Sequence, residues 1–169
     1  HHAARSLVVG DVDGDGRKEV LVGTEYYNSN LLEADGRIRW TIRGGPGFEA
    51  LALTDLNGDG CPEAVYGSMD GCVYAFEVIS GRKLWTSNLG DNVLQGFPVE
   101  AEGTAGFVAG SESGVVALLG PDGARKWWAD LGSSVTGLCR YPHAGGDRLA
   151  AATREGKLAL MDLHGKVLG

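Results

Sequence analysis

The chain lacks several features that would place it in a common protein class. It has only 3 cysteines and 5 prolines in 169 residues, and no apolar run approaches the length of a membrane span. Cys61, Cys72 and Cys139 are too few and too scattered for a disulfide framework or a zinc site, so we expect free thiols. No segment of ten or more residues combines helical periodicity with capping residues. These absences argue against a disulfide scaffold, a helical membrane protein and a helical bundle.

Basic charge is also scarce. The chain has 15 Lys and Arg against 22 Asp and Glu, a net charge of −7, and its pI is near 5.0. A nucleic-acid backbone requires a clustered basic surface, so we expect no nucleic-acid partner. Bound cations, in contrast, suit this balance. With 43% hydrophobic residues, the chain is expected to fold as one domain, residues 1–169, with a substantial core.

Glycine is abundant, and its positions disclose an internal repeat. The chain has 28 glycines, about twice the usual share, and they separate short apolar runs as tight turns do. Tryptophan follows a turn glycine at the same offset in "ADGRIRW", "ISGRKLW" and "PDGARKW", and "LHGKVLG" is a fourth copy. The repeated glycines are Gly36, Gly81, Gly123 and Gly165, at intervals of 45, 42 and 42 residues.

Each repeat contains four strand-like runs, which in the second copy are "EALALT", "EAVYGS", "CVYAFEV" and "KLWTSN". A repeat of this length with four antiparallel strands predicts an all-β fold, a β-propeller of four-stranded blades. We expect the tryptophans to pack as wedges between blades. The last copy stops where its fourth strand starts, so the chain is either an arc of a larger ring, which we favour, or a small four-blade ring. The predicted blades are residues 5–45, 46–90, 91–132 and 133–169, the last one incomplete.

Two acidic loops, "DVDGDGRKE" and "DLNGDGCPE", start at Asp11 and Asp55. Both have oxygen-bearing side chains at positions 1, 3, 5 and 9 and glycine at position 6, a pattern that can converge on one Ca²⁺ with a carbonyl at position 7. An EF-hand is rejected because position 12 is Val22 or Tyr66 and strands flank the loops. The alternative is a solvated acidic turn without an ion. The expected ligands are Asp11, Asp13, Asp15, the backbone carbonyl of Arg17 and Glu19 in the first loop, and Asp55, Asn57, Asp59, the backbone carbonyl of Cys61 and Glu63 in the second.

These motifs carry a family resemblance. The two loops resemble the calcium loops of FG-GAP/VCBS-type propeller repeats, which occur in integrin α-subunit heads and bacterial surface proteins. "DGCVYAFEVISGRKLWTSNLG" resembles a PQQ-like repeat. The resemblance implies a calcium-binding propeller located extracellularly, on the cell surface or in the periplasm, with the signal peptide outside this chain. Blade 3 has Gly106 where the closing acid belongs, and blade 4 has Tyr141 and His143 in place of acids, so we expect two Ca²⁺ sites.

The expected function is protein or glycan binding, including cell adhesion, or structural assembly, without catalysis. A second copy or another chain could complete the ring. Blade 1 has "TEYYNSN" where other blades have a tight turn, so Tyr26 and Tyr27 are candidate ligand contacts unless both rings pack on a neighbouring blade. The alternative function is a propeller fragment of an extracellular enzyme, either a polysaccharide lyase or a quinoprotein dehydrogenase, with its catalytic residues elsewhere. The chain has no adjacent cysteines of the kind usual in quinoproteins.

Overall fold

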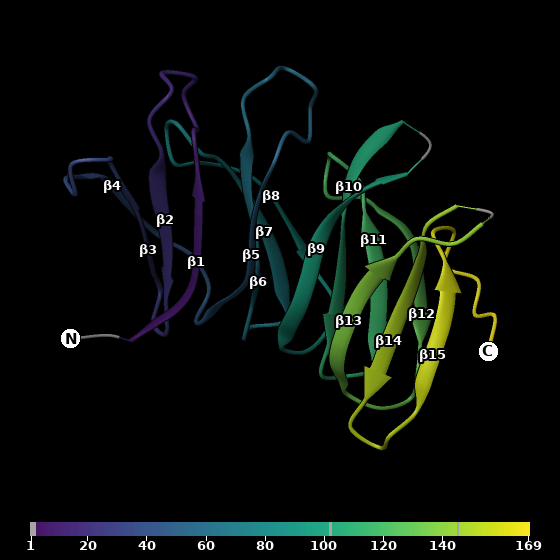
Figure 1. Cartoon of the computed structure of the whole chain (residues 1–169). Helices are drawn as coiled ribbons and strands as arrows, with labels where there is room; N and C mark the ends of the chain where they lie inside the picture. The colour runs from purple at the N-terminus through teal and green to yellow at the C-terminus, as the bar shows by residue number, and fades with distance from the viewer. Residues whose placement is uncertain (1–2, 102, 145) are drawn as a thin grey trace.

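The computed structural model describes residues 3–101, 103–144 and 146–169. Across these residues every regular element is a β-strand, and the strands form four consecutive antiparallel sheets, here named blades 1 to 4 (Figure 1). The all-β prediction is therefore confirmed. Blade 1 contains β1 (Ala4–Gly10), β2 (Glu19–Thr24), β3 (Asn28–Leu32) and β4 (Ile38–Arg43); blade 2 contains β5 (Phe48–Thr54), β6 (Glu63–Ser68), β7 (Cys72–Glu77) and β8 (Arg82–Asn88); blade 3 contains β9 (Val93–Ala101), β10 (Thr104–Ser111), β11 (Val115–Leu119) and β12 (Arg125–Asp130); blade 4 contains β13 (Val135–Tyr141), β14 (Arg148–Thr153) and β15 (Leu158–Asp162).

The blades lie in a row, with blade 1 at one end and blade 4 at the other (Figure 1). The first strands of successive blades, β1, β5, β9 and β13, are neighbours along one side of the row. Over the described residues the row is open, as expected for an arc. Blade 4 has three strands, and the chain after it only begins a fourth: Val167 forms a bridge with Met161, and Leu168 N–H donates to Leu160 O at 2.7 Å.

The core consists of three apolar clusters, one at each junction between adjacent blades. Between blades 1 and 2, Leu21 and Leu31 pack with Phe48 and Tyr66, and the last two rings lie 4.0 Å apart between centroids. The inner blade 2 is covered on both sides, so all six residues of β6 are buried. In the end blades, buried residues alternate with more exposed ones along β2 and β14. Each end blade therefore buries only one face.

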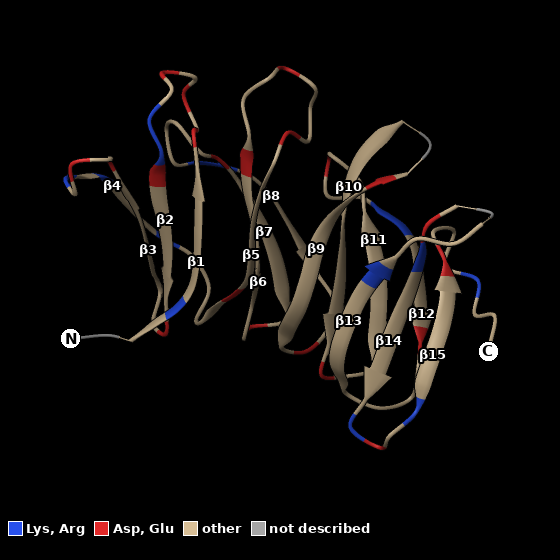
Figure 2. Cartoon of the chain, viewed as in Figure 1, with Lys and Arg blue, Asp and Glu red and all other residues tan. Residues whose placement is uncertain are grey.

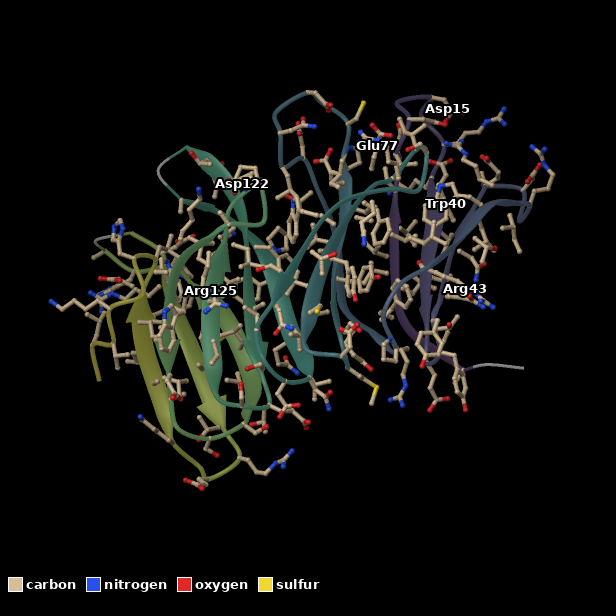
Figure 3. All side chains as sticks on the ribbon, turned by 180° about the vertical axis from the view of Figure 1, so that it is seen from behind. Asp15, Trp40, Arg43, Glu77, Asp122 and Arg125 are labelled. Carbon is tan, nitrogen blue, oxygen red and sulfur yellow. The ribbon has the colours of Figure 1, made fainter. Side chains whose placement is uncertain are left out.

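The three repeat tryptophans, Trp40, Trp85 and Trp127, lie between blades, as predicted, whereas Trp128 is exposed. Trp40 on β4 faces blade 2 (Figure 3), and its Nε1–H donates to the Val78 carbonyl at 2.9 Å. Indole burial with a satisfied N–H stabilises such a junction by roughly 3–5 kcal/mol as measured by truncation to alanine. The other two junctions repeat the contact, from Trp85 to Pro121 at 2.8 Å and from Trp127 to Leu163 at 2.7 Å.

The remaining features are local. Cys61, Cys72 and Cys139 are free thiols. Among the described residues, no helix is long and apolar enough to cross a membrane.

Candidate metal centre

The two acidic loops connect the first and second strands of blades 1 and 2. They project from the same edge of the row, where Figure 2 shows acidic residues in both. Each loop leaves an apolar strand and enters another one, so its ends are fixed by the sheet. The strand pairs close directly beneath the loops: Gly10 is paired with Glu19 in blade 1, and Thr54 with Glu63 in blade 2. The sheets thus hold both acidic segments in equivalent positions.

The first aspartate of each loop organises the backbone. Asp11 accepts hydrogen bonds from Gly14 N–H at 2.7 Å and Gly16 N–H at 3.0 Å, one on each carboxylate oxygen. Asp55 makes the same two bonds, to Gly58 N–H at 2.7 Å and Gly60 N–H at 2.9 Å. All four glycines have positive φ, between 76° and 86°. The turn therefore requires glycine at both positions and curls each loop around its first carboxylate.

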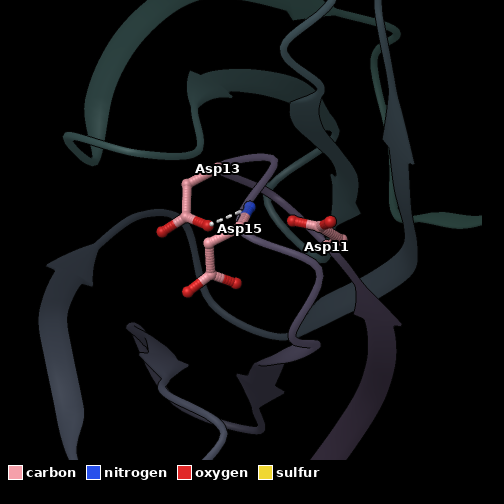
Figure 4. A group of neighbouring side chains, drawn as sticks. All are labelled: Asp11, Asp13 and Asp15. Atoms are coloured by element: carbon pink, nitrogen blue, oxygen red, sulfur yellow. Dashed lines mark hydrogen bonds between the residues drawn. The ribbon is translucent and has the colours of Figure 1, made fainter.

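Positions 3 and 5 form consecutive side-chain turns. Asp15 Oδ1 accepts from Arg17 N–H at 2.7 Å, and Asp13 Oδ1 accepts from Asp15 N–H at 3.3 Å (Figure 4). In the second loop, Asp59 accepts from Cys61 N–H and Asn57 accepts from Asp59 N–H, both at 2.8 Å. These bonds preorganise the loops because the side chains take the place of missing strand partners.

The first loop brings three carboxylates together. Asp11, Asp13 and Asp15 each offer a ligand oxygen, these atoms lie within 4.8 Å of one another, and all three residues are exposed (Figure 4). Hard carboxylate oxygens on a preformed turn are the donor set that Ca²⁺ prefers. Across the residues that the structure describes, this is the one group of three or more acidic, histidine or cysteine side chains close enough to share an ion. The second loop has two aspartates and an amide in the same places.

The glutamates at position 9 lie at the base of the loops. Glu19 is 2% exposed and Glu63 is 3% exposed. Glu19 Oε2 accepts from Val12 N–H at 3.1 Å, and Glu63 Oε2 accepts from Leu56 N–H at 2.7 Å. Burial raises the pKa of the Glu63 carboxyl, an effect that the Leu56 hydrogen bond partly opposes. Each glutamate thus ties position 2 of its loop to the start of the next strand. Glu63 Oε1 also accepts from Asn57 Nδ2 at 3.1 Å.

Arg39 is a neighbour of the first loop that sequence reasoning missed. Its Nη2 lies 2.6 Å from Asp13 Oδ2 and its Nε lies 2.5 Å from Glu33 Oε1. Hydrogen bonding to this guanidinium is the largest influence on both acids and lowers the pKa of Asp13 and of Glu33. The strand order could have indicated this contact. In an antiparallel meander the turn after β1 and the turn after β3 lie at the same edge of the sheet, so residues next to these two turns are close together. Blade 2 has Leu84 at the position of Arg39, three residues after the turn glycine.

The corresponding turns of blades 3 and 4 differ. In blade 3, β9 ends at Ala101 and β10 begins at Thr104, so the connection is much shorter than the acidic loops. In blade 4, Tyr141 and Arg148 pair at the base of the turn, and Asp147 forms an ion pair with Arg140 at 3.3 Å. That the chain holds two ions rather than four stays a prediction.

Tyr26 and Tyr27 lie in the turn between β2 and β3, at the opposite edge of blade 1 from the acidic loop. They are 50% and 53% exposed. Their carbonyls accept backbone bonds from Asn28 N–H and Gly44 N–H, both at 2.8 Å, which fix the turn. Neither ring is buried against a neighbouring blade, so both are accessible from solvent.

Together, the row of antiparallel sheets, three of four strands and one of three, and the acidic loops define a β-propeller protein. The family model described as outer membrane protein assembly factor BamB, a PQQ-like repeat, matches residues 69–168. The chain belongs to this PQQ-like repeat family. The FG-GAP repeat model matches residues 3–38, which include the first acidic loop. The second loop, residues 55–63, lies outside both matched segments.

Solved structures share the fold at low sequence identity, and no curated protein matches the chain. BBS1N, solved in complex with ARL6DN, is similar with a TM-score of 0.77 and 15% identity over 98% of this chain and 55% of that one. The computationally designed Ika8 protein gives 0.75 and 16% over 96% of this chain and 47% of Ika8. The designed Ika4 protein gives 0.73 and 16% over 95% and 91%. The chain thus spans about half the length of BBS1N and of Ika8.

Proposed function

We propose that the chain is a calcium-binding β-propeller module that acts in protein or glycan binding, or in structural assembly, outside the cytosol. The observation that carries the calcium proposal is the convergence of Asp11, Asp13 and Asp15 within 4.8 Å on a loop already curled by its own hydrogen bonds. The second loop repeats those hydrogen bonds with Asp55, Asn57 and Asp59. The carbonyls of Arg17 and Cys61 and the carboxylates of Glu19 and Glu63 complete the proposed ligand sets.

Bound Ca²⁺ would neutralise acidic charge that otherwise repels itself at one edge of the row. Loops of this kind in extracellular modules bind with dissociation constants of roughly 10⁻⁴ to 10⁻³ M, which extracellular calcium is sufficient to fill. A location outside the cytosol is also supported by the FG-GAP and PQQ-like matches. Within this proposal the ion has a structural role, and the chain supplies no catalytic group.

Two surfaces support a binding or assembly role. The half-exposed rings of Tyr26 and Tyr27 are rigid amphipathic groups of the kind that contact sugars and protein partners. Among the described residues, blades 1 and 4 each have one face that no other blade covers, and we propose that a second copy or another chain completes the ring there. The partner is therefore proposed as a protein or a glycan.

Thermal unfolding in Ca²⁺, Mg²⁺ and EGTA tests the calcium proposal. Ligand at about 100 times its dissociation constant stabilises the fold by about 2.7 kcal/mol per site, so Ca²⁺ should raise the melting temperature by several degrees over EGTA and Mg²⁺ much less. Asp11→Ala and Asp55→Ala should each remove one part of this increment, and the double variant should remove all of it.

Asp35→Asn is the matched control for these variants. It also removes one acidic charge from blade 1, but from the exposed β3–β4 turn, where Asp35 pairs with Arg37 at 2.8 Å. Its Ca²⁺ increment should equal that of the parent chain. An unchanged melting temperature in EGTA, together with no calcium by mass spectrometry or isothermal titration, would contradict the proposal.

A further inference from the structure

Lys126 in blade 3 is the repeat counterpart of Arg39 in blade 1, three residues after the turn glycine. Both occupy the extra position of the same β-bulge in the outermost strand, so their side chains leave the sheet at equivalent places. In blade 1 this cation is held by two carboxylates, Asp13 of the acidic loop at 2.6 Å and Glu33 at 2.5 Å. Blade 3 retains the cation but has neither of these acidic partners.

A glycine replaces Glu33 in blade 3, and a short connection replaces the acidic loop. In blade 1 the Gly36 N–H closes the turn before β4 by donating to Glu33 O at 2.8 Å. In blade 3 the Gly123 N–H donates to Gly120 O at 2.9 Å, so Gly120 takes the place of Glu33. Two residues connect β9 to β10, against eight between β1 and β2, so the loop that carries Asp13 has no equivalent there.

Lys126 is held only weakly by its own blade. Among the described residues it forms one ion pair, with Asp122, at 3.8 Å between Nζ and Oδ1, and the Asp122 side chain is 65% exposed. An ion pair of this length between exposed groups stabilises little. The Lys126 side chain lies across Gly120, where a Cβ would overlap Cε and lie 3.0 Å from Nζ. Any larger residue at position 120 would displace the amine from this place.

Lys126 lines a cavity of about 400 Å³ between blades 3 and 4. The indole of Trp127 and the side chains of Leu118 and Leu163 contribute to its apolar wall. Of the described residues that line the cavity none is acidic, and Lys126 and His164 are the two that can carry a positive charge. The cavity therefore combines an apolar wall with positive charge, and its volume lies within the range of small-molecule sites.

We propose that this cavity binds a small organic carboxylate. The carboxylate group pairs with Lys126 Nζ, in place of the acids that hold Arg39 in blade 1, and the apolar part of the molecule lies against Trp127 and Leu118. A cationic ligand is disfavoured, because it would meet positive charge without a carboxylate among the described lining residues. The acidic loops do not line this cavity, so the inference goes beyond the proposed function and does not depend on calcium.

Titration of the whole chain followed by amide NMR tests the site, with EGTA present so that calcium takes no part. Benzoate is the probe, benzamide has the same shape without the charge, and acetate has the charge without the ring. We expect benzoate to shift the amides of residues that line the cavity and the Trp127 indole N–H, with a dissociation constant of about 1 mM. Benzamide and acetate should each bind at least about tenfold more weakly, because each lacks one of the two interactions.

Lys126→Met keeps most of the side chain beside Gly120 and removes the amine. The affinity for benzoate should fall about tenfold, to that of benzamide. The melting temperature should stay within about 2 °C, because the ion pair with Asp122 is exposed. Lys83→Met is the matched control, since it removes the same charge from an exposed side chain on β8, outside the cavity, and should bind benzoate as the parent chain does.

Three results would overturn the proposal. One is an equal affinity of Lys126→Met and Lys83→Met for benzoate. Another is equal binding of benzoate and either analogue by the parent chain. The third is the absence of a saturable shift in the cavity up to about 20 mM benzoate. A failed calcium titration would leave these results unaffected.

Discussion

The acidic loops of blades 1 and 2 have the same hydrogen-bonded backbone but different charges around it. In both loops the first aspartate accepts two glycine amides and the buried glutamate accepts the amide of position 2. The third position is Asp13 in one loop and Asn57 in the other. Asp13 pairs with the guanidinium of Arg39, whereas Asn57 donates its own amide to Asp59 and Glu63 at 3.0 and 3.1 Å.

This difference shows two ways to hold clustered carboxylates together before any cation binds. In the first loop, the positive charge of Arg39 on β4 lies next to the carboxylate of Asp13. The second loop replaces one carboxylate by an amide and uses its N–H groups as internal donors. Both reduce repulsion between like charges at short distance. The common backbone and the variable charge can be separated by substitution.

Removal of the buried glutamate should lower the free energy of unfolding by a similar amount in both loops. This loss of stability is the largest effect that we expect. Glu19→Ala and Glu63→Ala should each lower the free energy of unfolding by about 1–3 kcal/mol in EGTA, because a buried amide, Val12 N–H or Leu56 N–H, loses its acceptor. Urea unfolding followed by tryptophan fluorescence measures the loss. Glu→Gln at the same positions is the control, since its carbonyl can still accept the bond and most of the stability should remain. A loss confined to one loop would show that the two backbones are not equivalent.

Charge should distinguish the loops through their third position. Asn57→Asp gives the second loop the carboxylates of the first without its arginine. We expect Ca²⁺ affinity at this loop to rise about tenfold, since affinity follows ligand charge, and the Ca²⁺-free chain to lose about 1 kcal/mol through the lost amide bonds and added repulsion. Isothermal titration and urea unfolding measure the two effects.

Asn30→Asp is the matched control for Asn57→Asp. It adds the same charge on β3, where the side-chain oxygen can still accept from Thr41 at 2.7 Å. Asn30→Asp should change both the calcium affinity and the Ca²⁺-free stability less than Asn57→Asp does. If both variants behave alike, net charge rather than loop geometry governs binding, and the comparison fails.

Much of this arrangement could be predicted from sequence, because it depends on local periodicity. Apolar alternation and turn glycines gave the strands, and the spacing of Trp40, Trp85 and Trp127 gave their place at the junctions. The direction in which a side chain points is harder to predict than its spacing in the sequence. Glu19 stands at position 9 of the loop, where a ligand is expected. Only the fold shows that one of its carboxylate oxygens accepts a hydrogen bond from the Val12 amide at 3.1 Å. Arg39 lies far from Asp13 in sequence, and its contact depends on the register of four paired strands.

Arg39 provides the finest test of the comparison. Arg39→Leu gives blade 1 the residue that blade 2 has at Leu84 and frees Asp13 Oδ2, which the guanidinium now holds at 2.6 Å. Removing a cation next to the proposed ion should tighten Ca²⁺ binding at the first loop by about 3–5-fold, since partly exposed charges interact only modestly in water. Arg37→Leu is the control, because it removes the same charge from an exposed side chain paired with Asp35.

The same variant has a signature in pH without calcium. Arg39 lowers the pKa of Asp13 and Glu33 in the folded chain, so the stability that it contributes is present above their ordinary pKa values and is lost as the pH falls through the lowered ones. In EGTA the parent chain should therefore be more stable than Arg39→Leu near pH 7, and the difference should shrink as the pH drops below about 4. Equal calcium affinities for Arg39→Leu and Arg37→Leu, or a stability difference that does not change with pH, would show that Arg39 does not set the charge of the first loop.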